Sequence, residues 1–267
     1  HLSIRRQRQM CIRDRKGALY EISCNDFLLR LNTVGTFRVK KGNTIIIDPR
    51  PNATNSEIRL FLLTSTMGAL LHQRDILSLH GSSVMKNNQA ITIVGHSSSG
   101  KSSLAAGLAA DGYSILSDDI SVLTYSDNNN FKVQPGLPYL KLWKDVLKYM
   151  HFDENYNKVR PSLNKYIKPL NLEYCANPML LKKIICLETK NDITFSHELV
   201  TGVKKFNLIK NHTYRIQYLY DAGKIQNHFR KVTSLLEQIT VFRVYRPERP
   251  LMINELVSYL NKQILYG

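Results

Sequence analysis

The chain carries a run of residues whose types and spacing fit a phosphate-binding loop, G-x-x-x-x-G-K-[ST]. In such a loop the glycines let backbone N–H groups converge on an anion, and the helix that follows adds partial positive charge. Lys101 would neutralise the β- and γ-phosphate oxygens, and the Ser102 hydroxyl would ligate Mg²⁺. ATP with Mg²⁺ is therefore the expected ligand. The expected contact residues are Gly95, His96, Ser97, Ser98, Ser99, Gly100, Lys101, Ser102 and Ser103.

Two adjacent carboxylates, Asp118 and Asp119, follow seventeen positions after the loop lysine. A carboxylate beside a phosphate loop can hold Mg²⁺ directly or through water. Because neighbouring carboxylates repel, one of the pair can stay protonatable and accept a proton from an incoming hydroxyl. We assign Asp118, with Ser102, to the metal and Asp119 to the base, and the reverse assignment stays open.

Upstream of the loop, His80 lies in the segment Leu79–Val84. A histidine there is either a satisfied core residue or an active-site group. If its segment pairs with the strand that precedes the loop, His80 would approach the γ-phosphate and could steady transferred charge. We therefore place His80 with Lys101, Asp118 and Asp119 among the expected catalytic residues.

The elements that must position these groups can be read from local pattern. Residues 90–94 are a β-branched apolar run typical of a buried strand, and residues 103–110 are small and apolar, as in a packed helix. Residues 113–117 predict a second strand that ends at the aspartates. The fold class is therefore α/β. We expect a β-rich N-terminal region over 17–75 and a P-loop domain over 76–267.

In this order, the histidine segment, the phosphate loop and Leu116-Ser117-Asp118-Asp119 resemble the HPr kinase/phosphorylase C-terminal fold, which is related to ATP-dependent phosphoenolpyruvate carboxykinase. The similarity is greater to HPr-kinase-related proteins found beside peptide-modification genes, including the lasso-peptide kinases. Pro135–Trp143 supports this subgroup, and the likeness spans roughly residues 19–265.

The resemblance implies an ATP-dependent serine kinase that phosphorylates a peptide or protein. In the lasso-peptide kinases the acceptor is the C-terminal Ser of a precursor peptide. Val133–Trp143 departs from the true HPr kinase/phosphorylases, since it lacks their essential acidic residue, which puts phosphorylase activity and HPr as substrate in question. Alternatives are a catalytically weak ATP-binding partner in a peptide-modification complex and a small-molecule or HPr-type kinase. Ser98 motivates the weak partner, because many such loops have Gly there.

Several other basic and aromatic residues leave two interpretations open. Tyr139, Lys141 and Trp143 could face a substrate, although a core role for Trp143 fits as well. One of Lys158, Arg160 and Lys165 could clamp a phosphate or a peptide carboxylate; a solvated face is the alternative. For Arg243, Arg246 and Arg249 we favour surface solubility.

Composition sets the outer bounds. The 267 residues carry a formal net charge of +16, and the first sixteen hold six basic groups against one acidic group. That stretch has little apolar periodicity and resembles translated sequencing-adapter sequence, so residues 1–16 are expected to be a non-native or disordered tail. The four cysteines suggest free thiols in a reducing compartment. No signal-peptide core or membrane span is indicated, and we expect a cytoplasmic protein that does not bind nucleic acid; homo-oligomerisation is left open.

Overall fold

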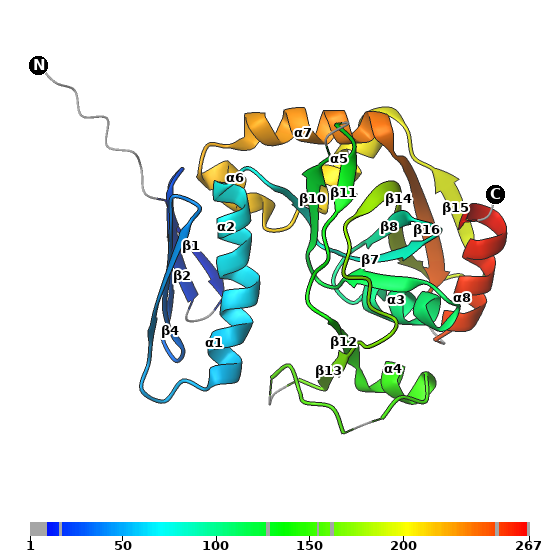
Figure 1. Ribbon diagram of the computed structural model, residues 1–267, viewed down its shortest axis with the longest axis horizontal. Helices are drawn as coiled ribbons and strands as arrows, with labels where there is room; N and C mark the ends of the chain where they lie inside the picture. Colours follow the sequence, from blue (N-terminus) through cyan, green and yellow to red (C-terminus); the bar gives the residue numbers. More distant parts are fainter. Residues whose placement is uncertain are drawn as a thin grey trace, which may run out of the picture. The chain divides into compact units, whose positions relative to one another are not determined.

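The computed structural model describes residues 10–15, 18–126, 129–153, 155–160, 163–248 and 251–265 (Figure 1). The chain divides into two compact units. Unit 1 comprises residues 1–76 and 215–229, and unit 2 comprises residues 77–214 and 230–267. The first boundary falls beside the expected one after residue 75. The return of residues 215–229 to unit 1 was not expected, because that segment was placed in the P-loop domain.

In the described part of unit 1, strands form a five-stranded antiparallel sheet in sequence order. The strands are β1 (Met10–Arg15), β2 (Ala18–Ile22), β3 (Asp26–Leu31), β4 (Gly35–Lys40) and β5 (Thr44–Pro49). Burial alternates along β4, where Phe37 and Val39 are fully buried. One face of the sheet is therefore a core face.

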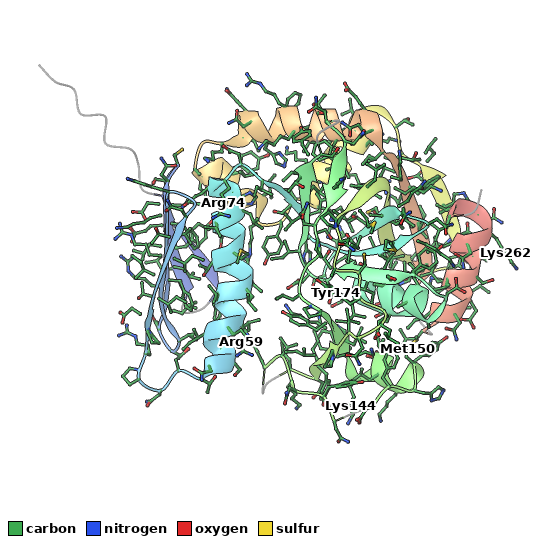
Figure 2. The ribbon with its side chains drawn as sticks, viewed as in Figure 1. Arg59, Arg74, Lys144, Met150, Tyr174 and Lys262 are labelled. Atoms are coloured by element: carbon green, nitrogen blue, oxygen red, sulfur yellow. The ribbon has the colours of Figure 1, made fainter. Side chains whose placement is uncertain are left out.

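Helical residues supply the other half of the core of unit 1. α1 (Asn55–Phe61), the π-helical turn η1 (Leu62–Thr66) and α2 (Met67–Gln73) run continuously beside the sheet (Figure 1). A capping box begins α1, since Thr54 and Glu57 each bond the other's backbone N–H. Figure 2 places Arg59 on α1 and Arg74 just after α2. α6 (Ile216–Asp221) adds Tyr218, whose ring packs against Phe27.

The expectation for residues 1–16 needs correction in part. Met10–Arg15 form β1, which pairs antiparallel with β2 from Met10 opposite Ile22 to Arg15 opposite Ala18. An edge strand is held by main-chain hydrogen bonds, so a segment without apolar periodicity can still form one. The other residues of the expected tail, 1–9 and 16, lie outside the described residues.

Unit 2 is built on a sheet that, among the described residues, has nine strands. The order is β6-β10-β11-β14-β8-β7-β9, with β16 beside β14 and β15 beside β16. β8 (Gln89–Val94), β14 (Met179–Lys190) and β16 (Thr240–Pro247) are parallel. The remaining strands are β6 (Leu77–Leu79), β7 (Gly81–Lys86), β9 (Ser114–Ser117), β10 (Ser121–Tyr125), β11 (Phe131–Val133) and β15 (Ser196–Leu199).

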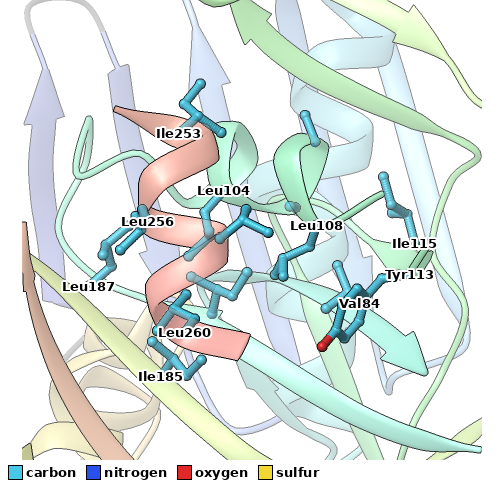
Figure 3. Packing of buried hydrophobic residues seen from close by; sticks show 14 of the residues in the cluster. Val84, Leu104, Leu108, Tyr113, Ile115, Ile185, Leu187, Ile253, Leu256 and Leu260 are labelled. Atoms are coloured by element: carbon cyan, nitrogen blue, oxygen red, sulfur yellow. The ribbon is translucent and has the colours of Figure 1, made fainter. Parts of the chain in front are cut away.

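Both faces of this sheet are covered by helices. Ile91 and Ile93 of β8 join one apolar cluster, whereas Ala90 and Val94 join another, as the two-residue period of a strand requires. The first cluster contains α3 (Lys101–Ala110) and α8 (Ile253–Leu260), which continues into η2 (Asn261–Leu265) (Figure 3). The second contains α5 (Gly202–Asn211) and the later part of α7 (Ile225–Gln238).

A separate two-stranded sheet completes unit 2. β12 (Tyr139–Trp143) pairs antiparallel with β13 (Lys165–Pro169), and α4 (Lys144–Tyr149) follows β12 directly. Figure 2 labels Lys144 at the start of α4. Leu140 and Leu142 point into the first apolar cluster, so the alternate residues of β12 face away from that core. The fold is thus mixed α/β. No helix in the described residues is long and apolar enough to cross a membrane.

Candidate functional site

The loop between β8 and α3 has a backbone that only glycine can supply at its ends. Gly95 has φ +153°, and a Cβ there would lie 2.4 Å from the carbonyl oxygen of Leu187. Gly100, at φ +100°, is the left-handed residue that precedes α3. Both glycines of the sequence motif are therefore required by conformation, and at Gly95 by close backbone approach as well.

Two serines inside the loop, Ser98 and Ser99, have unusual local features. Ser98 adopts φ +65°, a region that costs a residue with a Cβ about 1 kcal/mol. Beside it, the Ser99 hydroxyl is buried and has no hydrogen-bond partner among the described residues. A buried hydroxyl without a partner is unusual and indicates a polar group that can still receive a ligand.

The N-terminus of α3 offers donors to the same space. No side chain caps the helix at Gly100, and the Leu104 N–H is bonded to the Gly100 carbonyl. The N–H groups that precede Leu104 in the first turn have no acceptor within the helix. The buried Lys101 ammonium donates to the carbonyls of Gly95 at 3.0 Å and His96 at 2.9 Å. Lys101 thus lies folded over the loop.

Asp118 is held by three donors from three elements. Its Oδ1 accepts from the Ser102 hydroxyl at 2.8 Å and the Ser82 hydroxyl at 2.6 Å, and its Oδ2 accepts from the Lys141 backbone N–H at 2.8 Å. The structure therefore brings the two expected metal ligands, Ser102 and Asp118, into direct contact. Their oxygens are of the kind that Mg²⁺ prefers.

Asp119 has a different set of neighbours. Its Oδ2 is 2.7 Å from the Lys141 ammonium, and its Oδ1 is 3.7 Å from Nδ1 of His80. The same His80 nitrogen donates to the Asp119 carbonyl at 3.1 Å. Asp119 adopts φ +75°, a left-handed conformation that Asp tolerates better than most residues. Lys141 thus contacts both carboxylates, one through its backbone and one through its side chain.

These contacts correct the electrostatic argument made from the sequence. Burial by itself would raise the pKa of Asp119, but the Lys141 ammonium, then His80 and Lys165, hold that pKa below its usual value. Repulsion within the pair therefore does not leave Asp119 protonated. Burial and the charge on Lys101 lower the pKa of His80 against the opposing effect of Asp119, so the imidazole is neutral near neutral pH.

An open cleft of ≈ 1120 Å³ unites these groups. It is bordered by residues 96–100 of the loop and the start of α3, by the aspartate pair, and by residues of β12, β13, β14 and β16, whereas Gly95 is not among its lining residues. The expected site residues that line it are His80, His96, Ser97, Ser98, Ser99, Gly100, Lys101, Ser102, Ser103, Asp118 and Asp119. Its volume is slightly above the roughly 300–1,000 Å³ of a typical small-molecule pocket.

Two cleft residues that contact expected site residues, Lys141 and Arg246, were not assigned to the site from sequence. Lys141 was noted only as a substrate-loop residue, and its contacts with the aspartates arise from β12. Arg246, for which we favoured surface solubility, instead donates from Nε to the Ser99 carbonyl at 2.9 Å and lines the cleft. Arg243 forms ion pairs with Glu188 and Glu198, and Arg249 lies outside the described residues. The sequence motif indicates where the loop lies, but it does not indicate which distant residues contact the loop.

A histidine and a cysteine lie behind the loop. The His96 ring meets the His212 ring edge-on at 5.6 Å, and Nε2 of the buried His212 is 3.4 Å from Sγ of Cys186. Burial, with His96 and Lys101 next, lowers the pKa of His212 to about 4, and burial raises the pKa of Cys186 to about 12. Both groups are therefore neutral at neutral pH. The three cysteines with described side chains, Cys24, Cys175 and Cys186, are free thiols.

The residues present fit a nucleotide with Mg²⁺. The Ser99 hydroxyl, which has no partner among the described residues, and the uncapped start of α3 are hydrogen-bond donors that an anion could accept from. Among the described residues no group of three His, Cys, Asp or Glu side chains gathers as a metal site. From the protein, a Mg²⁺ ion would take Ser102 and Asp118, with its other ligands from phosphate oxygens and water.

Comparisons with known proteins give distant structural likenesses and no sequence match. No family model matches the chain, and no curated protein matches it. Among solved structures, the Hpr(Ser) kinase/phosphatase from Coxiella burnetii is similar to this chain at 13% sequence identity. The match covers 71% of this chain and 91% of that chain, with a TM-score of 0.36.

Proposed function

We propose that the chain is an ATP-dependent kinase that transfers the γ-phosphoryl group to a seryl hydroxyl of a peptide or protein, on a P-loop fold of the HPr kinase and phosphoenolpyruvate carboxykinase type. One observation carries the proposal. The glycine-ended loop, with the uncapped helix start and Lys101, shares a cleft with a carboxylate pair whose members have different partners. Anion binding and proton acceptance are thus available side by side.

The residues that would hold the nucleotide are those of the loop and the first turn of α3. Backbone N–H groups between Gly95 and Ser103 and the Lys101 ammonium would bind the phosphates, and Ser102 with Asp118 would hold Mg²⁺. When bound, MgATP supplies the transferable phosphoryl group, with the metal offsetting its charge. Arg246 binds the Ser99 carbonyl and so helps to fix the conformation of the loop.

Asp119 would orient the acceptor hydroxyl and accept its proton. The depressed pKa keeps this carboxylate ionised at neutral pH, so it can accept a hydrogen bond from the hydroxyl before transfer. The Lys141 ammonium fixes the carboxylate at 2.7 Å, and His80 holds the backbone of Asp119. His80, neutral near neutral pH, donates through Nδ1 to the Asp119 carbonyl, which leaves its Nε2 for the acceptor or the transferred group.

The proposal is tested by incubating the chain with MgATP and seryl peptides, among them precursor peptides of the lasso type that end in Ser. We expect the intact mass of a peptide to rise by one HPO₃ group. Asp119→Asn should lower the transfer rate by about a hundredfold or more, because general-base catalysis is lost. The control is Asp145→Asn. The Asp145 carboxylate also lines the cleft and accepts a hydrogen bond from the Val146 N–H. Full transfer by Asp119→Asn would remove Asp119 as the base, and ATP binding without transfer to any peptide would indicate a nucleotide-binding partner instead.

A further inference from the structure

The face of the β12–β13 sheet that borders the cleft has a defined set of side chains. Lys141 and Trp143 are two residues apart on β12 and therefore share a face, opposite to the buried Leu140 and Leu142. Lys165 of β13 pairs directly with Trp143 and so lies on the same face. All three line the cleft.

Lys165 has the properties of a docking cation. Its ammonium lies 5.8 Å from the centre of the Trp143 ring, which is 38% exposed. In the described part of the chain, no carboxylate is within ion-pair distance of it, whereas Lys141 is paired with Asp119. Lys165 is also close enough to Lys101 and Asp119 to lower the pKa of each. An unpaired ammonium held over an aromatic ring beside the reacting groups is suited to an anionic ligand.

We infer that Lys165 and Trp143 form an acceptor subsite that binds a carboxylate on the peptide, about two residues from the phosphorylated serine. The inference rests on the proposed function. Lys141 marks the acceptor end, because its ammonium touches Asp119, and Trp143 lies two residues further along β12, about 7 Å away. An extended peptide advances by the same rise per residue. The peptide residue two positions from the serine therefore reaches Lys165.

The carboxylate could be an Asp or Glu side chain or the end of the peptide. Both sources present the same chemistry to Lys165, and the length of the face allows either. The exposed Trp143 ring adds flat apolar contact for the residue between the serine and the carboxylate. In the proposed function the phosphate groups of the nucleotide would be bound by the loop and Lys101, in another part of the cleft.

A second lysine–aromatic pair provides a matched control. Lys158 lies 5.9 Å from the centre of the Tyr166 ring. Tyr166 is opposite Leu142 in the sheet and thus on the other face from Trp143 and Lys165. Lys158 is exposed, and neither Lys158 nor Tyr166 lines the cleft. Replacing Lys158 removes the same charge from a residue that bridges to β13 without touching the subsite.

The test measures phosphotransfer to a set of seryl peptides with MgATP. In one arm the peptides are amidated and carry Glu or Gln at each position up to three residues from the serine. In the other arm they end one residue after the serine as free acid or amide. We expect kcat/KM to be about five- to tenfold higher for Glu than for Gln at the second position, or for acid than for amide, as an ion pair in a partly desolvated cleft allows.

Lys165→Met should abolish this preference, measured within the variant as the ratio of kcat/KM for the acidic peptide to that for the neutral one, and Lys158→Met should keep it. Lys165→Glu should reverse it, favouring Lys at the same position. Transfer without an acid preference in either arm, or a preference that survives in Lys165→Met, overturns the subsite alone. Absence of transfer to every peptide, with ATP bound, overturns the proposed function and the subsite with it.

Discussion

At the residue scale, the site holds two non-glycine residues with left-handed backbone, Ser98 and Asp119. Sparsely populated conformations persist where the surrounding structure enforces them, and they gather at functional sites. At Asp119 the conformation accompanies contacts with Lys141 and His80. Ser98 has no hydrogen bond of its own in the described structure to offset its strain. The backbone strain of the phosphate loop is therefore uncompensated at Ser98.

Replacing Ser98 with glycine should therefore relieve strain. We expect Ser98→Gly to raise the free energy of unfolding by up to about 1 kcal/mol, because the left-handed penalty exceeds the entropy that glycine adds to the unfolded chain. The neighbouring Ser97 does not have a positive φ. Ser97→Gly should accordingly lower stability by about 0.5–1 kcal/mol. Urea denaturation of the two variants measures this difference, and a loss of stability in Ser98→Gly would contradict the strain at that position.

At the element scale, α3 is fixed by close packing against α8. Ile253 and Val257 of α8 lie nearest to Gly107 of α3, and apolar residues of both helices belong to one cluster (Figure 3). The approach is permitted by Gly107, where an added Cβ would lie 2.4 Å from Cγ2 of Ile253. The position of the helix start that bears Lys101 and Ser102 thus depends on a glycine more than one turn away.

Gly107→Ala tests this dependence. Alanine improves helix propensity by about 1 kcal/mol, yet overpacking against a β-branched side chain costs about 1–3 kcal/mol, so we expect a net loss of stability. Ile253→Leu removes the Cγ2 group while conserving volume. In a double-mutant cycle by thermal unfolding, Ile253→Leu should restore part of the loss caused by Gly107→Ala. Additive effects of the two substitutions would show that the contact does not limit the packing.

The elements around the loop were accessible from the sequence because their signals are local. The strand predicted over 90–94 and the helix predicted over 103–110 are confirmed as β8 and α3, and the strand over 113–117 as β9 (Ser114–Ser117). Long-range contacts left no such signal. Arg246 reaches Ser99 across 147 positions, and Lys141 reaches Asp119 across 22. Neither periodicity nor spacing encodes which distant side chain completes a site.

At the scale of the whole molecule, buried neutral histidine links stability to pH. The pKa of His212 falls from 6.5 to about 4 on folding, chiefly through burial, and that of His80 falls as well. Between these two values the unfolded chain binds a proton that the folded chain does not. The free energy of unfolding is therefore highest above the pKa of the unfolded state. It decreases as the pH falls toward the pKa of the folded state.

Measured from about pH 7 to about pH 4.5, the free energy of unfolding should fall, with a contribution from His212 of at most about 3 kcal/mol. His212→Gln removes one of these titrating groups, so its stability should vary less with pH over this range than that of the parent chain. Denaturant unfolding at a series of pH values compares the slopes independently of the absolute stability of the variant. Equal slopes would mean that His212 does not titrate as its burial indicates.

The charge of the whole chain does not identify a partner. The net charge is +16, but the cleft itself is lined by five basic residues (Lys101, Lys141, Lys144, Lys165 and Arg246) and five acidic ones (Asp118, Asp119, Asp145, Glu188 and Glu248). What favours an anionic ligand at the loop is therefore local, namely the Lys101 ammonium and the uncapped start of α3.

The most direct test of that claim is competition by nucleotides for a fluorescent ATP analogue bound with Mg²⁺. ATP and ADP should displace the analogue at least about tenfold more strongly than AMP, because in the proposed function the loop would contact the phosphates that AMP lacks. Lys101→Met should weaken ATP binding by about ten- to a hundredfold, and Lys158→Met, outside the cleft, should leave it unchanged. AMP competing as well as ATP, or Lys101→Met binding ATP as tightly as the parent chain, would contradict phosphate binding at the start of α3.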